Sequence, residues 1–116
     1  EALDALAFAI KKYADKDDPE TYRFAALSKA FEVALEYVWK DIKRYVENEG
    51  LDVASPKEAI RQAARLGLID DAQRFIMFVN ARNASVHDYF EATRQSFVKL
   101  VKDFHEKSGP LVKKLS

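Results

Sequence analysis

The feature that most constrains the fold is an apolar seam that runs between about residues 19 and 48. Apolar side chains recur there every three or four residues, the spacing that places them on one face of an α-helix. The seam consists of Phe24, Leu27, Phe31, Leu35, Val38, Ile42 and Tyr45. Because spacings of three and four alternate, as in coiled coils, we predict one long helix that packs against neighbouring helices.

Shorter helical segments lie on either side of this seam. An amphipathic segment over about residues 2–14 comes first. After the long helix, Ser55 can cap a third helix, Pro56 suits the first helical position and Glu58 completes a capping box. Gly67 can adopt the left-handed conformation that ends such a helix.

Two further helices are expected in the second half of the chain. The aspartates at 70–71 suit the positive end of a helix dipole, so a fourth helix begins there and is expected to reach about residue 87 or 88. A fifth helix is expected to end at Gly109-Pro110, which leaves residues 109–116 as a short tail. Its apolar stripe consists of Phe97, Leu100, Val101 and Phe104.

These segments predict the fold class. A chain of 116 residues is the size of one domain, and no linker or repeat divides it. Only three Gly and three Pro are present, too few for the many turns of an all-β fold. We predict a single all-α domain over residues 1–116, an up-and-down bundle of four to five helices.

The fourth helix holds five consecutive apolar residues, from Phe75 to Val79. Such a run covers most of a helix circumference, whereas a surface helix of a monomer needs only one apolar stripe. We therefore predict a homodimer in which one side of this helix faces its own bundle and the other a second subunit. The predicted interface consists of Phe75, Met77, Phe78 and Val79. The alternative is a central helix wholly enclosed by its own chain.

Composition excludes several kinds of site and partner. The absence of Cys excludes disulfides and thiolate metal sites and fits a cytoplasmic location. Two His and scattered carboxylates do not form a recognisable metal site. No apolar run approaches the length of a membrane span. The 19 basic and 19 acidic residues balance, which speaks against a large basic face, and we expect neither a membrane nor a DNA partner.

The strongest candidate for a functional site is the stretch from Arg82 to Tyr89. Asn83 and His87 lie four residues apart and so share one helix face, while Arg82 has to reach around the axis to join them. Arg can hold a phosphate through two hydrogen bonds, and His titrates near neutral pH and can act as general acid or base. Tyr89 adds a phenolic oxygen close by.

Each of these residues also has an ordinary structural interpretation. His87 can be a hydrogen-bonded core or interface residue, and Arg82 can pair with a carboxylate. Asn83 can mark the end of a helix, and Tyr89 can be an amphipathic packing residue. The pattern alone leaves both interpretations open.

The motif Arg82-Asn83-x3-His87-x-Tyr89 resembles that of the HEPN domains in HEPN/MNT toxin–antitoxin pairs. Within that superfamily the chain is most similar to the branch called nucleotidyltransferase substrate-binding proteins. Three other stretches carry the resemblance: Phe31-Glu32-x4-Tyr37-x-Trp39-Lys40, Ser55-Pro56-Lys57-Glu58 and Gly67-Leu68-Ile69-Asp70-Asp71.

This resemblance implies a helical homodimer with a composite RNA-cleaving cleft at the subunit interface. The cleavage would need no metal and no intrinsic cofactor. His87 would act as acid or base at the ribose hydroxyl or the leaving oxygen, and Arg82 would steady the phosphate in the transition state. Asn83 occupies the polar position that commonly follows the Arg.

The resemblance also implies a minimal nucleotidyltransferase as the partner. That enzyme would use ATP and Mg²⁺ to transfer AMP to Tyr89, and the added negative charge would block the RNA cleft. Two alternatives stand beside this hypothesis. One is a binding subunit for the nucleotidyltransferase without ribonuclease activity, and the other is a plain helical scaffold.

Overall fold

The computed structural model describes residues 2–14, 20–83 and 91–115. Within these ranges the chain forms five α-helices and no strand. The helices are α1 (Ala2–Ala14), α2 (Glu20–Asn48), α3 (Pro56–Arg65), α4 (Ala72–Asn83) and α5 (Glu91–Leu115). The predicted all-α class is confirmed, and so is the single long helix.

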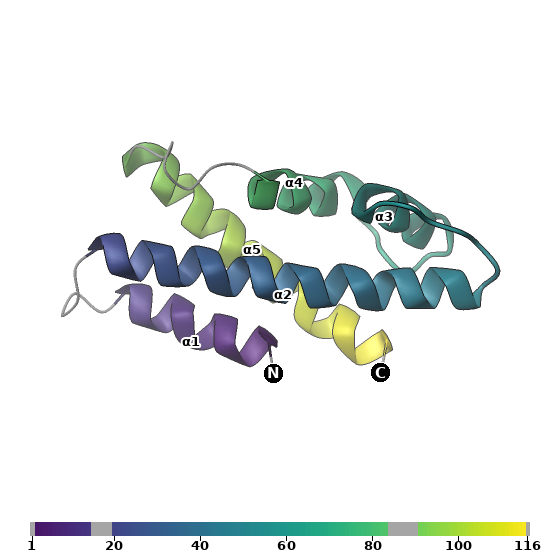
Figure 1. The fold of residues 1–116 in the computed structure, drawn as a ribbon, viewed down its shortest axis with the longest axis horizontal. Coiled ribbons are helices and arrows are strands. Elements are labelled where there is room, and N and C mark those ends of the chain that lie inside the picture. Colours follow the sequence, from purple (N-terminus) through teal and green to yellow (C-terminus); the bar gives the residue numbers. More distant parts are fainter. Residues whose placement is uncertain (1, 15–19, 84–90, 116) are drawn as a thin grey trace.

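Helix α2 organises the molecule. Its 29 residues extend about 44 Å at 1.5 Å per residue, most of the 48 Å longest dimension. The other four helices all pack against it. Figure 1 shows α1 antiparallel to α2 on one side, α3 and α4 on the opposite side, and α5 crossing α2 obliquely.

The predicted seam of α2 forms the centre of the core. Its six residues from Phe24 to Ile42 are each at most 2% exposed. Phe31 makes edge-to-face ring contacts with Phe97 and Phe104 of α5, at centroid distances of 5.5 and 5.2 Å. Phe104 in turn meets Phe78 of α4 at 5.3 Å. One chain of aromatic contacts therefore joins α2, α5 and α4.

Local signals define both ends of α3 as predicted. The backbone N–H of Glu58 donates to the Ser55 side-chain oxygen at 3.2 Å, so Ser55 is the N-cap. Gly67 adopts a φ of +79°, and the N–H of Leu68 donates to the carbonyl oxygen of Ala63 at 2.9 Å. This is the Schellman arrangement, in which glycine avoids the strain of the left-handed conformation.

The C-terminal end of α5 differs from the prediction. The helix continues through Gly109 and Pro110 to Leu115, so residues 109–115 are helical and do not form a tail. Pro110 lacks the N–H that an interior helical residue donates. Leu111, however, is only 5% exposed within the core. Burial of apolar side chains beyond the proline offsets the missing hydrogen bond, which explains why the Gly-Pro pair does not end the helix.

The apolar run of α4 is buried largely by its own chain. Phe75, Phe78 and Val79 are at most 5% exposed, because α4 packs against α2, α3 and α5. These three side chains leave almost no surface for another subunit to cover, which corrects the expectation that all four predicted interface residues face a partner. Met77 is 48% exposed, so α4 is not wholly enclosed either. The homodimer stays a prediction.

We expect Phe31→Ala to lower the free energy of unfolding by about 3–5 kcal/mol, since it removes a buried ring at the junction of α2 and α5. Urea denaturation followed by circular dichroism measures this change. Phe8→Ala is the matched control, because Phe8 is 63% exposed, and it should change stability by no more than about 0.5 kcal/mol. Equal losses in the two variants would contradict the central position of Phe31.

Candidate functional site

Two of the four predicted site residues lie at the C-terminal end of α4. Arg82 and Asn83 are its last residues, and the Arg82 guanidinium Nη1 lies 3.4 Å from the Asn83 amide oxygen. His87 and Tyr89 lie outside the described residues, as does the predicted continuation of the fourth helix to residue 87 or 88. The described residues therefore include only the arginine end of the motif.

Arg82 contacts two carboxylates on the middle of α2. Its Nη2 atom lies 3.4 Å from Oε2 of Glu36 and 4.0 Å from Oε1 of Glu32. Glu32 and Glu36 are four residues apart, so they share one face of α2. The pairing of Arg82 with a carboxylate, which the sequence left open, is thus present. The Arg82 side chain still exposes 35% of its surface and remains accessible to a ligand.

Glu36 is the centre of a larger polar network. Its Oε2 accepts a hydrogen bond from the indole nitrogen of Trp39 at 3.1 Å, and its Oε1 lies 3.3 Å from the Lys40 ammonium. The hydrogen bond from Trp39 lowers the pKa of Glu36, partial burial opposes this shift, and Lys40 and Arg82 add to the lowering. Glu36 thereby links the indole of α2 to the guanidinium of α4.

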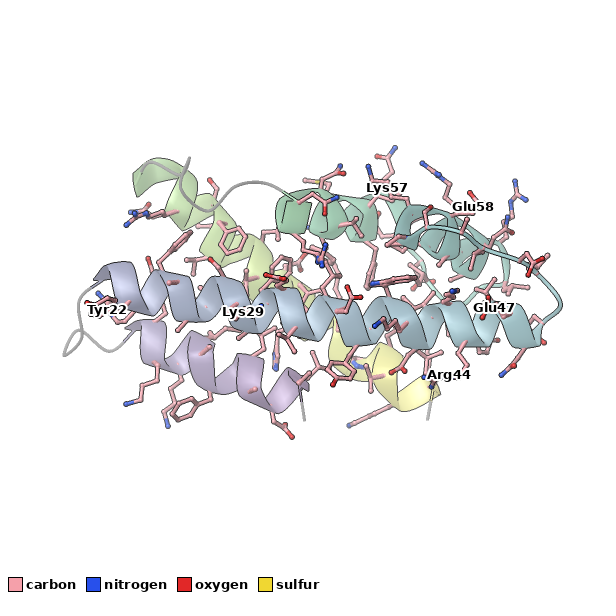
Figure 2. The ribbon with its side chains drawn as sticks, viewed as in Figure 1. Tyr22, Lys29, Arg44, Glu47, Lys57 and Glu58 are labelled. Carbon is pink, nitrogen blue, oxygen red and sulfur yellow. The ribbon has the colours of Figure 1, made fainter. Side chains whose placement is uncertain are left out.

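A pocket of about 440 Å³ opens beside this network, between α2, the start of α3 and the end of α4. Figure 2 shows Lys57 at the end of α3 nearest α4. The lining residues are Leu35, Glu36, Trp39, Ser55, Pro56, Lys57, Val79, Arg82 and Asn83. The base is apolar, since Leu35 is 1% and Val79 4% exposed. The polar and charged groups lie around it.

The pocket brings together three stretches that are far apart in the sequence. Trp39, Lys57 and Arg82 come from α2, α3 and α4, and each belongs to a stretch that carries the family resemblance. The sequence patterns singled out none of Trp39, Lys57 and Glu36 as a site residue. The four-residue spacing of Glu32 and Glu36 is a signal for a shared acidic face, but it does not say which cation the face meets.

No metal centre accompanies this pocket in the described part of the chain. Within residues 2–14, 20–83 and 91–115, no three His, Asp or Glu side chains gather where they could hold a metal ion. Among the helices described, none combines the length and the apolar character needed to cross a membrane.

The sequence profile of the family described as "nucleotidyltransferase substrate binding protein like" matches residues 1–116. The chain belongs to this family. The match agrees with the branch to which the sequence motifs pointed. A search among curated proteins found no match.

Two solved structures have the same fold as this chain. A crystal structure from Thermus thermophilus has a TM-score of 0.80 and 31% sequence identity, and the match covers 99% of this chain and 98% of that one. A Haemophilus influenzae protein has a TM-score of 0.82 and 22% identity, with 98% and 93% of the two chains covered. That structure is described as revealing the fold of a substrate binding domain of a nucleotidyltransferase.

The charge of Glu36 is expected to stabilise the structure in a pH-dependent way. Because its folded-state pKa lies below the ordinary value of 4.5, the contribution is fully present above that pH and is lost as the pH falls through the folded-state pKa. Wild type and Glu36→Gln should therefore differ in the free energy of unfolding at pH 7, by no more than about 1 kcal/mol, and converge in acid. Urea unfolding at a series of pH values measures this.

Trp39 provides a local readout for the same variant, because it is the only Trp in the sequence. Its fluorescence should change when wild type is titrated into acid and should not change in Glu36→Gln. Glu47→Gln is the control, since it removes a carboxylate of the same helix that lies 4.0 Å from Lys43. Identical titrations in all three proteins would show that Glu36 does not set the environment of Trp39.

Proposed function

We propose that this chain is the substrate-binding subunit of a separate minimal nucleotidyltransferase, and that it acts through the surface around Arg82. The observation that carries the proposal is the convergence of three resemblance-bearing stretches at one pocket, with Arg82 partly exposed on its wall. Membership of the nucleotidyltransferase substrate-binding family supports the choice of partner. So does the Haemophilus influenzae protein of the same fold, which is described as such a domain.

Tyr89 is the proposed acceptor of the transferred group. Its phenolic oxygen would attack the α-phosphorus of ATP held by the partner enzyme with Mg²⁺. A new oxygen–phosphorus bond forms, the bond from the α-phosphorus to the bridging oxygen breaks, and pyrophosphate leaves. The phenolic proton passes to a base or to water. Arg82, seven residues earlier in the chain, would attract the triphosphate through its charge.

Incubation with the partner enzyme, ATP and Mg²⁺ should raise the mass of this chain by one or more AMP units, and Tyr89→Phe should abolish the increase. Intact-protein mass spectrometry measures the change. Tyr37→Phe is the control, because Tyr37 is 62% exposed on α2 and is a competing acceptor. An unchanged mass in wild type, or a loss of modification in Tyr37→Phe alone, would contradict the assignment to Tyr89.

A second candidate function is metal-independent RNA cleavage by a homodimer. The observation that favours it is that Arg82, although paired with Glu36, keeps 35% of its side-chain surface exposed beside a pocket, where its guanidinium can meet a phosphate. In this proposal His87 transfers a proton at the ribose hydroxyl or leaving oxygen. Arg82 and Asn83 steady the phosphate while negative charge builds up on it. The partner's AMP transfer would then switch the cleavage off.

His87→Ala and Arg82→Ala should each reduce RNA cleavage at least about 100-fold while leaving the protein folded, since proton transfer by His87 and stabilisation of the phosphate charge by Arg82 each contribute roughly that factor or more. Cleavage of a labelled single-stranded RNA in the presence of EDTA measures the rate. His105→Ala is the control, because His105 is the only other His and lines a different groove, formed by α1, α2 and α5. Full activity in His87→Ala would exclude the ribonuclease and leave the binding role.

A further inference from the structure

A second ion pair holds α4, at the opposite end of the helix from Arg82. The Nε of Arg74 donates a hydrogen bond to Oδ2 of Asp103 on α5 at 2.6 Å, whereas Arg82 pairs with carboxylates of α2. We infer that Arg74 and Asp103 are positioning residues whose ion pair fixes how α4 is turned against α5, and therefore where Arg82 lies. The inference rests on the proposed function in that the positioned site is the one around Arg82.

The Arg74 side chain is held by several groups at once. Its guanidinium lies over the Phe78 ring, 5.3 Å from the centroid, and its Nη1 is 3.8 Å from Sδ of Met77. The side chains of Arg74 and Asp103 each expose only 28% of their surface. Because these contacts hold the guanidinium, its hydrogen bond to Asp103 has a defined direction.

The Asp103 carboxylate is held on α5 by a second cation. Its Oδ1 lies 3.6 Å from the Lys107 ammonium on the same helix, while its Oδ2 accepts the hydrogen bond from Arg74. Each oxygen thus has its own cation. Asparagine at position 103 would keep the size of the side chain but would lose the charge that both cations meet.

Apolar packing alone defines the rotation of α4 less closely. Phe75, Phe78 and Val79 determine which face of α4 is buried, but the hydrophobic effect is non-directional. A charge-assisted hydrogen bond depends on both distance and angle, so it restricts sliding and rotation of the helix. Since a partly exposed ion pair contributes little to overall stability, the role that we assign to this pair is geometric.

The place of the pair along the chain connects it to the motif. Arg74 is in the first turn of α4 and Asp103 is in the middle of α5. Residues 84–90, which include His87 and Tyr89, join the other end of α4 to the start of α5. A rotation of α4 against α5 would therefore move Arg82 relative to the start of α5 and away from its carboxylates on α2.

The indole N–H signal of Trp39 in a proton–nitrogen correlation spectrum tests the inference on the intact chain. Trp39 is the only Trp, and its N–H donates to Glu36, which pairs with Arg82. Arg82→Ala gives the signal position expected when that pairing is lost. Asp103→Asn should move the signal from the wild-type position toward that of Arg82→Ala, although position 103 belongs to another helix.

Conservative and control variants separate positioning from stability. Asp103→Glu keeps the charge and should stay closer to wild type than Asp103→Asn. Arg61→Gln is the matched control, because it breaks an ion pair with Glu58 that lies within α3 alone, and it should leave the indole signal in place. Circular dichroism and the urea midpoint confirm that each variant is folded. The inference is overturned if Asp103→Asn moves the signal no further than Arg61→Gln, or no further than Asp103→Glu.

The kinetics of AMP transfer provide a second readout. Because a misplacement of about 1 Å can lower a rate on the order of 100-fold, Asp103→Asn should slow the maximal rate of transfer at least about tenfold. The concentration of this chain at half-maximal rate should change by no more than about twofold. A change in that concentration alone would contradict a positioning role.

The two readouts distinguish this inference from the proposed function. The indole signal requires neither a partner enzyme nor RNA. An absence of AMP transfer to the wild-type chain would therefore contradict the proposed function, while the indole signal still tests the role of Arg74 and Asp103.

Discussion

Ring contacts between phenylalanines of three helices hold the other features in place. Phe31 of α2 touches Phe97 and Phe104 of α5, and Phe104 touches Phe78 of α4. A surface helix of 12 residues such as α4 has little stability by itself, so its position depends on this packing. Because Arg82 is near the last turn of α4, the aromatic core determines where the guanidinium meets α2.

Glu36 connects this packed core to the candidate site. It is placed by α2, yet it contacts Arg82 of α4 and the indole of Trp39. A partly exposed ion pair of this kind contributes little to overall stability. Its importance is geometric, because one carboxylate orients a cation and an aromatic ring on the same wall of a pocket.

The sequence predicted those features that depend on neighbours along the chain. The seam of α2 and the cap of α3 at Ser55 follow from spacing and local hydrogen bonding, and both are confirmed. The helical end of α5 was missed, because the burial of Leu111 depends on contacts with distant helices. For the same reason Arg82 was predicted as a site residue, whereas its ion-pair partner Glu36 was not. That pairing exists only once α4 lies across α2.

The length of α2 has an evolutionary consequence. Its buried seam and its polar face around Glu36 are carried by one uninterrupted helix of 29 residues. Each inserted or deleted residue would rotate everything beyond it by about 100° around the axis, so the seam before the change and the polar face after it would lose their alignment. Substitutions can alter the side chains around the pocket while the fold persists. Insertions and deletions within α2 would have to disrupt either the core or the pocket, so we expect relatives to vary in length mainly between the helices.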